Sequence, residues 1–153
     1  MKRFKFNLES VLKYRASVER QEKGVLSGLN AQLNILLNAL DKLNSDYSAA
    51  AFAFEKMSLE GVSVHEIRSH HVIMENIEFY VAKKIKEIEA QRKLVERQTA
   101  VVVRAMRETK TMDRLKELRY EEYIKKENKE QERFVEEFVS QQEFIKKKLS
   151  NYN

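Results

Sequence analysis

The chain has 153 residues with no proline, only three glycines and 35% charged side chains, a composition that favours long, solvated helices. It has no cysteine, which excludes a disulfide framework and a thiolate metal site and favours a reducing, cytoplasmic location. No apolar run approaches the roughly 20 residues that span a bilayer, and no signal peptide is present at the start, so we expect no direct membrane insertion.

Apolar residues recur in the first half of the chain at alternating steps of three and four residues. Such steps average 3.5 residues, the period that keeps one face of a helix against a partner helix in a coiled coil. We therefore predict a first helix over residues 7–58, with Asn7 as its N-cap. The ladder consists of Leu26, Leu29, Leu33, Leu36, Leu40, Leu43, Tyr47, Ala50, Phe54 and Met57.

A turn is predicted at residues 59–63. Gly61 follows the last residue of the ladder, where a left-handed residue commonly ends a helix. Ser63 and Glu66 have the spacing of a capping box at the start of a new helix. The predicted second helix covers residues 64–149.

Folding back at this turn aligns the two helices so that paired residue numbers add to about 121. The apolar pairs are then Phe54 with Ile67, Tyr47 with Met74, Leu40 with Val81, Leu33 with Ile88, and Leu26 with Val95. The predicted fold class is therefore all-α, a long two-helix antiparallel coiled-coil hairpin whose second helix is longer than the first. We expect residues 1–153 to form a single coiled-coil domain.

The second predicted helix is longer than the first and extends beyond its start, because Leu8 would lie opposite about position 113. Residues beyond about 115 are expected to have no partner within the chain, yet they retain apolar positions. One interpretation is that this stretch frays or folds back loosely, and the other is that it buries its stripe on a partner protein. The apolar positions are Leu115, Leu118, Tyr123, Phe134, Phe138, Ile145 and Leu149.

Residues that could perform chemistry are few. His65 and Glu66 begin a pattern like the zinc-binding HExxH helix, but that motif needs a second histidine four residues on, and Ser69 stands there. His70 is instead about 140° around the helix from His65. There is also no glycine-rich phosphate loop and no credible nucleophile arrangement. We expect no enzyme activity, no metal and no cofactor.

Two phenylalanines, Phe52 and Phe79, fall at outward positions of the coiled coil, and Ile73 and Tyr80 lie beside the second. Isolated exposed apolar residues are ordinary, but aromatic residues are also the usual anchors of interfaces. Both interpretations stay open: a partner-binding surface or scattered exposure.

The net charge of +5 is concentrated near the paired ends of the predicted hairpin. Residues 1–23 and residues 97–119 each hold seven basic and three acidic side chains, whereas residues 41–82 hold three basic and seven acidic ones. A basic end could bind nucleic acid, but acidic residues interleave the basic ones and no stacking platform is recognisable. A solvated helix face is the simpler interpretation. A basic coiled coil that binds nucleic acid or acts as a general scaffold remains the alternative function.

Three segments resemble the FliJ family of the bacterial flagellar type III export apparatus. The first has the pattern Phe-x-Phe-x-Leu-x-x-Val-Leu-x-x-Arg, met by Phe4, Phe6, Leu8, Val11, Leu12 and Arg15. The second is similar to a Lys-x-Leu-x-x-Leu segment and contains Lys110, Met112 and Leu115. The third surrounds Glu136 and Glu137, where family members usually have Asp-Glu.

The resemblance implies a non-catalytic antiparallel coiled coil, similar to the central stalk subunit of rotary ATPases. Its implied partners are the hexameric flagellar export ATPase, the cytoplasmic domain of the export gate protein and the export chaperones, with no nucleic acid. The implied location is cytoplasmic, peripheral at the inner face of the cell membrane through the export apparatus.

Two sets of partner-binding residues follow from the resemblance together with the outward aromatic residues and the basic end. Toward the export gate we expect Leu40, Tyr47, Phe52, Ile73, Ile77, Phe79 and Tyr80. Toward the ATPase we expect Arg104, Arg107, Lys110, Arg114, Phe134 and Phe138.

Overall fold

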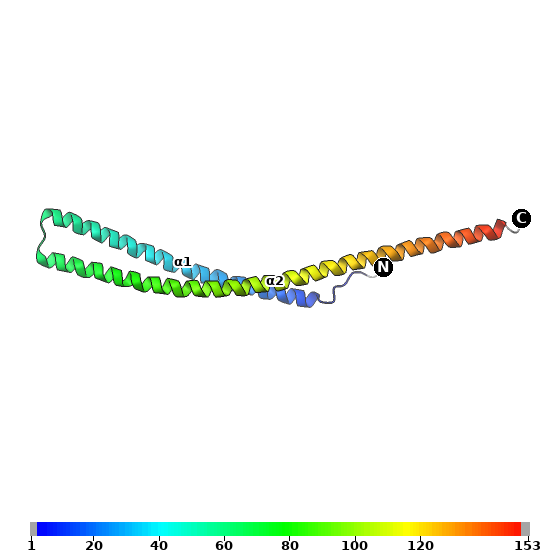
Figure 1. Ribbon diagram of the computed structural model, residues 1–153, viewed down its shortest axis with the longest axis horizontal. Helices are drawn as coiled ribbons and strands as arrows, with labels where there is room; N and C mark the ends of the chain where they lie inside the picture. The colour runs from blue at the N-terminus through cyan, green and yellow to red at the C-terminus, as the bar shows by residue number, and fades with distance from the viewer. Residues whose placement is uncertain (1–2, 151–153) are drawn as a thin grey trace. The chain divides into compact units, whose positions relative to one another are not determined.

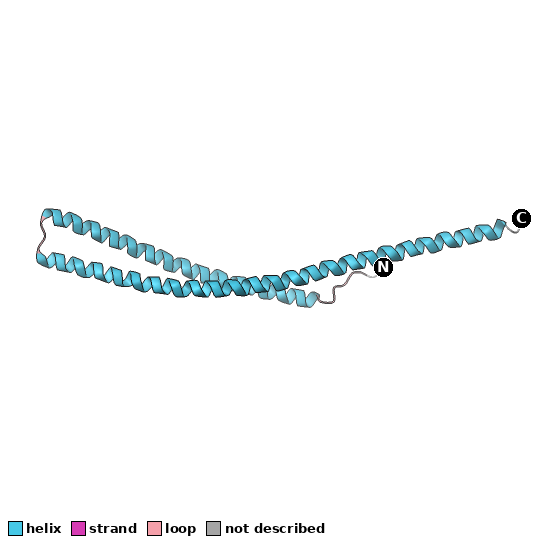
Figure 2. Ribbon diagram, in the orientation of Figure 1, coloured by secondary structure: helices cyan, strands magenta, loops and turns pink. Residues whose placement is uncertain are grey.

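The structure, a computed structural model, describes the backbone of residues 3–150 and the side chains of residues 3–147. Within these residues it contains two helices and no strand (Figures 1 and 2). Helix α1 covers Glu9–Glu60 and helix α2 covers Val64–Ser150. The all-α prediction of a two-helix hairpin with a longer second helix is confirmed. The side chain of Leu149, one of the expected apolar positions, lies outside the described residues.

The turn between the helices is built by the residues expected there. Gly61 has a φ of 89°, the left-handed conformation that glycine adopts without steric cost. The Ser63 amide donates to the Glu66 carboxylate at 2.9 Å, and the Glu66 amide donates to the Ser63 hydroxyl at 3.3 Å. This reciprocal pair is a capping box, which satisfies two backbone donors that have no partner inside α2.

The chain divides into two compact units, and the first is the hairpin unit, residues 17–106. Here α1 and α2 pack through one stripe on each helix. The ladder from Leu26 to Met57 lies on the inward side of α1, and each of its members is partly buried. Facing residues on α2 recur at the same spacing, and Ile88, with 4% of its surface exposed, is the most buried of them. The apolar residues of that α2 stripe are Met74, Ile77, Val81, Ile88, Val95, Val102 and Ala105.

The predicted alignment of the helices holds within one residue in the middle of the hairpin unit and fails at the turn. The Gln91 side chain bonds to the backbone of Leu29, whose predicted partner was position 92. Near the turn, however, Phe54 contacts the ring of His70 at 5.2 Å, and Ile67 is 43% exposed. The predicted pair of Phe54 with Ile67 is therefore wrong. Phe54 lies six residues before the end of α1 and His70 six residues after the start of α2, so equal helical rise places these two side by side.

The second compact unit, called the terminal unit here, contains residues 3–16 and 107–150 among those described. The beginning of α1 runs antiparallel to α2 within it. The Arg15 guanidinium lies 2.6 Å from the Glu108 carboxylate, and the Lys116 ammonium lies 2.8 Å from the Glu9 carboxylate. Leu12 is buried in the same unit.

The residues before α1 extend the pairing beyond the predicted limit. Phe4 contacts the rings of Tyr120 and Tyr123, at centroid distances of 5.2 and 5.6 Å, and Phe6 is buried. The prediction that α2 has no intramolecular partner beyond about residue 115 is therefore wrong as far as Tyr123. An extended chain advances about 3.3 Å per residue against about 1.5 Å in a helix, so a few non-helical residues reach two turns further along α2.

Past this contact α2 continues as a helix to Ser150. The described side chains from Asn128 to Lys147 are all exposed, among them Phe134 and Phe138. The sequence allowed this stretch either to fray or fold back or to remain helical and bind a partner. The structure contains a continuous helix there, so the first interpretation is wrong. Its apolar side chains remain uncovered.

Candidate partner-binding surfaces

The outward aromatic residues of the hairpin unit lie where the sequence placed them. Phe52 on α1 is 70% exposed and Phe79 on α2 is 64% exposed. Tyr80 contacts Phe79 edge to face, with ring centroids 5.6 Å apart, and Ile73 is also exposed. Phe52 is on α1 and the other three residues are on α2, so the four share exposure to solvent and do not form one continuous patch. The set is called the hairpin aromatic surface here.

Three other residues expected to face the export gate lie in the helix interface. Leu40, Tyr47 and Ile77 are each partly buried on the inward stripes. The Tyr47 hydroxyl donates to the Glu78 carboxylate at 3.1 Å, and this bond to a nearby negative charge raises the pKa of Tyr47 above 10.0. These side chains hold the two helices together, and a partner would reach only their exposed edges.

The basic residues of the terminal unit form an exposed stripe on α2. Arg107, Lys110 and Arg114 follow one another at steps of three and four residues, so they share one face of the helix. That face is turned away from Met112, which is partly buried toward α1. The Arg114 guanidinium donates to Glu117 at 2.8 Å, which raises the pKa of Arg114. We call these three residues the basic stripe. Arg104, expected with them, is exposed in the hairpin unit.

Beyond the basic stripe, residues 130–143 of α2 are acidic and carry exposed apolar side chains. Phe134 and Phe138, both expected to face the ATPase, are exposed. Val135 and Val139 stand beside them and are exposed as well. Glutamates outnumber basic residues five to one between positions 130 and 143. This surface combines uncovered apolar groups with negative charge.

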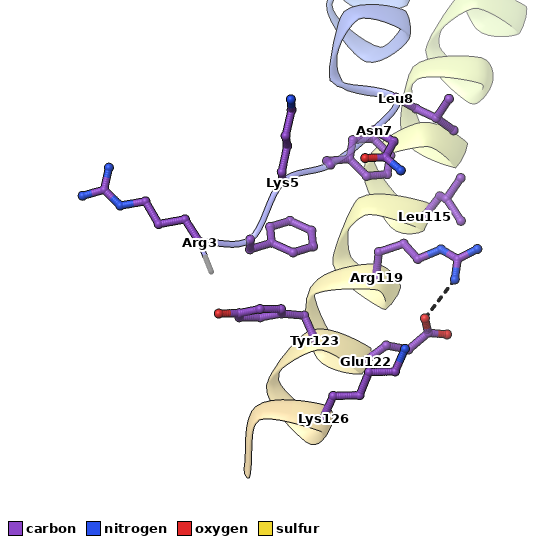
Figure 3. Close-up of a pocket in the computed structure, with 11 residues that line it drawn as sticks. Arg3, Lys5, Asn7, Leu8, Leu115, Arg119, Glu122, Tyr123 and Lys126 are labelled. Carbon is purple, nitrogen blue, oxygen red and sulfur yellow. Dashed lines mark hydrogen bonds and ion pairs between the residues drawn. The ribbon is translucent and has the colours of Figure 1, made fainter. Parts of the chain in front are cut away.

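The terminal unit also contains a groove that the sequence did not predict. Residues 3–8 and the α2 residues between Leu115 and Lys126 enclose a groove of about 760 Å³ (Figure 3). Phe4 contributes to its apolar lining, and the Arg119 guanidinium donates to Glu122 at its edge at 2.9 Å. The signal was present in the alternation of Phe4, Phe6 and Leu8 just before the helix start. Alternation of this kind marks an extended segment with one apolar side.

The described residues do not gather metal-ligating side chains. They contain no group of three or more His, Cys, Asp or Glu side chains placed to hold a metal ion. His65 is exposed, whereas His70 lies in the helix interface against Phe54, so the HExxH-like pattern does not gather its histidines. No helix in the described part of the chain is both long and apolar enough to cross a membrane.

The chain matches a known protein family over nearly its whole length. Residues 4–148 match the model of the family described as Flagellar FliJ protein, which is nearly the whole chain. Neither the search of curated proteins nor that of solved structures found a match.

Proposed function

Because this chain belongs to the FliJ family, it is a component of flagellar protein export, and we propose that it links the export ATPase to the export gate without catalysing a reaction. The single observation that carries the proposal is the family match over residues 4–148. A match of that extent includes both the terminal unit and the hairpin unit, so it covers both of the proposed contact regions.

The terminal unit is the proposed contact with the ATPase. Family members resemble the stalk subunits of rotary ATPases, in which the paired ends of the two helices enter the ring. In this chain the paired ends carry the exposed basic stripe, Arg107, Lys110 and Arg114. Carboxylates on a ring can match these exposed cations, and of these three described side chains only Arg114 must first give up an exposed ion pair, with Glu117. Arg104, Phe134 and Phe138 complete the proposed ATPase set.

The hairpin unit is the proposed contact with the cytoplasmic domain of the export gate protein. The hairpin aromatic surface supports this assignment, because exposed aromatic side chains are common anchors of protein interfaces. Leu40, Tyr47 and Ile77 contribute through their exposed edges. Export chaperones are further proposed partners. The proposed location is the cytoplasm, at the inner face of the membrane, where the export apparatus would hold the protein peripherally.

The ATPase contact is tested by reversing the basic stripe. The variant Arg107→Glu/Lys110→Glu/Arg114→Glu is expected to reduce stimulation of the purified export ATPase at least ten-fold. Circular dichroism should show unchanged helicity, because all three side chains are exposed and none lies between the helices. A matched control, Lys86→Glu/Arg92→Glu/Lys93→Glu, makes the same charge change at exposed positions of α2 in the hairpin unit.

Two outcomes would contradict this assignment. One is full stimulation by the stripe variant, which would mean that these cations do not meet the ring. The other is equal loss from the control variant, which would mean that only the total charge of the chain matters. The expected result is a loss confined to the stripe variant.

A further inference from the structure

One face of α2 in the terminal unit continues past its contact with residues 3–8. Four residues recur there at steps of eleven positions, which is three helical turns plus about 20°, so successive members lie on nearly the same side of the helix. They are Met112, Tyr123, Phe134 and Ile145. Met112 is partly buried toward α1, and the Tyr123 ring contacts the ring of Phe4. Phe134 and Ile145 are instead 71% and 57% exposed.

The uncovered part of this face belongs to the overhang, which is residues 128–150 of α2. Phe134, Phe138, Gln141 and Ile145 lie there within about 60° around the helix, and this set is called the overhang stripe here. Its three apolar members are all exposed, and apolar groups gathered on one face mark an interaction site. Because the same face of α2 already packs against α1 further back, the stripe suits a second helix laid along α2.

The spacing of the overhang stripe is the same when it is read in either direction. Its steps are four, three and four residues. A second copy laid antiparallel therefore aligns residues whose numbers add to 279, with Phe134 opposite Ile145 and Phe138 opposite Gln141. Every member of the stripe then faces a member of the same stripe on the other copy. The overhang is thus complementary to itself.

The charges of the overhang favour the antiparallel direction. Residues 130–137 hold four glutamates and one arginine, a net charge of −3, and residues 142–149, which this alignment places opposite them, hold three lysines and one glutamate, a net charge of +2. A parallel pair would place like charges side by side. It would also lay the second α2 along the face that carries Met112 and Tyr123, where α1 and Phe4 already lie. In the antiparallel pair, Ser150 falls opposite position 129 and leaves that face clear.

We propose that two copies of this chain pair antiparallel along their overhang stripes. The two-fold axis passes α2 midway between residues 139 and 140, and the same contact is made twice about it. Such an interface is closed, so the product is a dimer and does not grow into a filament. Each copy covers the stripe of the other, and the contact between Phe4 and Tyr123 stays in place in both.

The inference does not depend on the proposed function, since it uses only the spacing, exposure and charge of the overhang. It does have a consequence for that function. Phe134 and Phe138 are covered in the dimer, and they also belong to the proposed ATPase contact. The ATPase ring and the second copy then compete for the same side chains.

Sedimentation of the purified full-length chain between 1 and 100 µM tests the proposal. The expected result is a reversible monomer–dimer equilibrium. Phe134→Ala/Phe138→Ala should raise the dissociation constant at least ten-fold, while alanine keeps the overhang helical by circular dichroism. The control Val139→Ala removes an exposed apolar side chain about 130° around the helix from the stripe and should leave the constant unchanged. A chain that stays monomeric at 100 µM in low salt would overturn the proposal, as would a dimer that the double alanine variant does not weaken.

Two charge variants of the same segment test which face is used. Glu130 and Glu137 lie within about 70° of the centre of the stripe, whereas Glu132 and Glu136 lie at least 150° from it. Glu130→Lys/Glu137→Lys should therefore raise the dissociation constant at least five-fold, and added salt should reduce this effect. Glu132→Lys/Glu136→Lys makes the same charge change on the far side and should alter the constant less than two-fold. Equal effects from the two variants would contradict the proposed face.

A cysteine crosslink tests the direction of pairing, because the chain has no cysteine of its own. In the proposed dimer the two copies of position 141 are only about 5 Å apart along the helix axis, so Gln141→Cys should give a disulfide-linked dimer under mild oxidation. Gln131→Cys replaces the same residue type on the same side of α2, but its two copies are about 26 Å apart, and it should not crosslink. A parallel pair would bring both positions together, so equal crosslinking of the two variants would contradict the antiparallel arrangement.

Discussion

The side-chain amide of Gln91 donates a hydrogen bond of 2.9 Å to the backbone carbonyl of Leu29, across the interface of α1 and α2. Gln98 repeats the contact seven residues further on, where its amide donates to the carbonyl of Glu22 at 3.2 Å and to that residue's carboxylate. A polar residue inside a coiled-coil interface favours the alignment in which its bonds are made. These two glutamines therefore select the alignment of the hairpin unit.

Truncating Gln91 separates the contribution of its hydrogen bond from that of its packing. Gln91→Ala is expected to lower the free energy of unfolding by about 1–2 kcal/mol, because it removes both the bond and buried side-chain atoms. Gln91→Leu should cost less, because leucine restores apolar contact and the Leu29 carbonyl keeps its bond within α1. Urea unfolding followed by circular dichroism measures both. Equal losses from the two variants would mean that the hydrogen bond dominates.

Alanine substitution is expected to lower the stability of the protein at Gly61 and to raise it at Gly24 and Gly28. Gly61→Ala should destabilise the hairpin by about 1 kcal/mol, because a φ of 89° is unfavourable for a residue with a Cβ. Gly24→Ala and Gly28→Ala should each stabilise it by about 1 kcal/mol, because alanine favours a helix and the added Cβ meets no atom within 4 Å. Thermal unfolding gives the sign of each change. Destabilisation at Gly24 or Gly28 would contradict the open space that surrounds both positions.

The capping box makes the turn sensitive to acid. Hydrogen bonds from Ser63 lower the pKa of Glu66 below its ordinary value of 4.5. Because the folded state holds the carboxylate deprotonated, Glu66 adds stability above the unfolded pKa, and this is lost as the pH falls through the folded pKa. In Ser63→Ala the pKa of Glu66 should move back up toward 4.5, as an NMR titration of its side chain would show. An unchanged pKa would mean that the Ser63 hydroxyl is not the cause and that the backbone amide of residue 63 is sufficient.

The ion pair of Arg15 with Glu108 should contribute little despite its 2.6 Å separation. Both side chains are about two-fifths exposed, so water and salt screen their attraction. A double-mutant cycle with Arg15→Gln and Glu108→Gln should give a coupling below about 1 kcal/mol, decreasing further at 1 M salt. A larger coupling that salt does not change would indicate a pair shielded from water.

The sequence predicted the parts of the fold that depend on local patterns. The ladder from Leu26 to Met57 has a period that suits one structure, and Ser63 with Glu66 has a spacing that suits one cap. The alignment at the turn was harder to predict. With rungs spaced every three or four residues, a shift of one rung still pairs most apolar residues, so only contacts such as Phe54 with His70 separate the alternatives.

The candidate surfaces were predictable to a similar degree. Outward positions follow from helical period, which is why Phe52 and Phe79 were placed correctly. The groove was not predicted, because it depends on how far a non-helical segment travels beside a helix. Phe4 meets Tyr120 only because the residues before α1 are extended. Sequence spacing within α2 carries no information about that contact.

The most direct test of the central claim is a pull-down from the native cytoplasm with the tagged full-length chain. The proposed function predicts that the hexameric export ATPase is recovered with the unmodified chain and with Lys86→Glu/Arg92→Glu/Lys93→Glu. Recovery should fall at least ten-fold with Arg107→Glu/Lys110→Glu/Arg114→Glu. Absence of the ATPase from all three samples would contradict the account, as would nucleic acid recovered in its place and lost with the basic stripe.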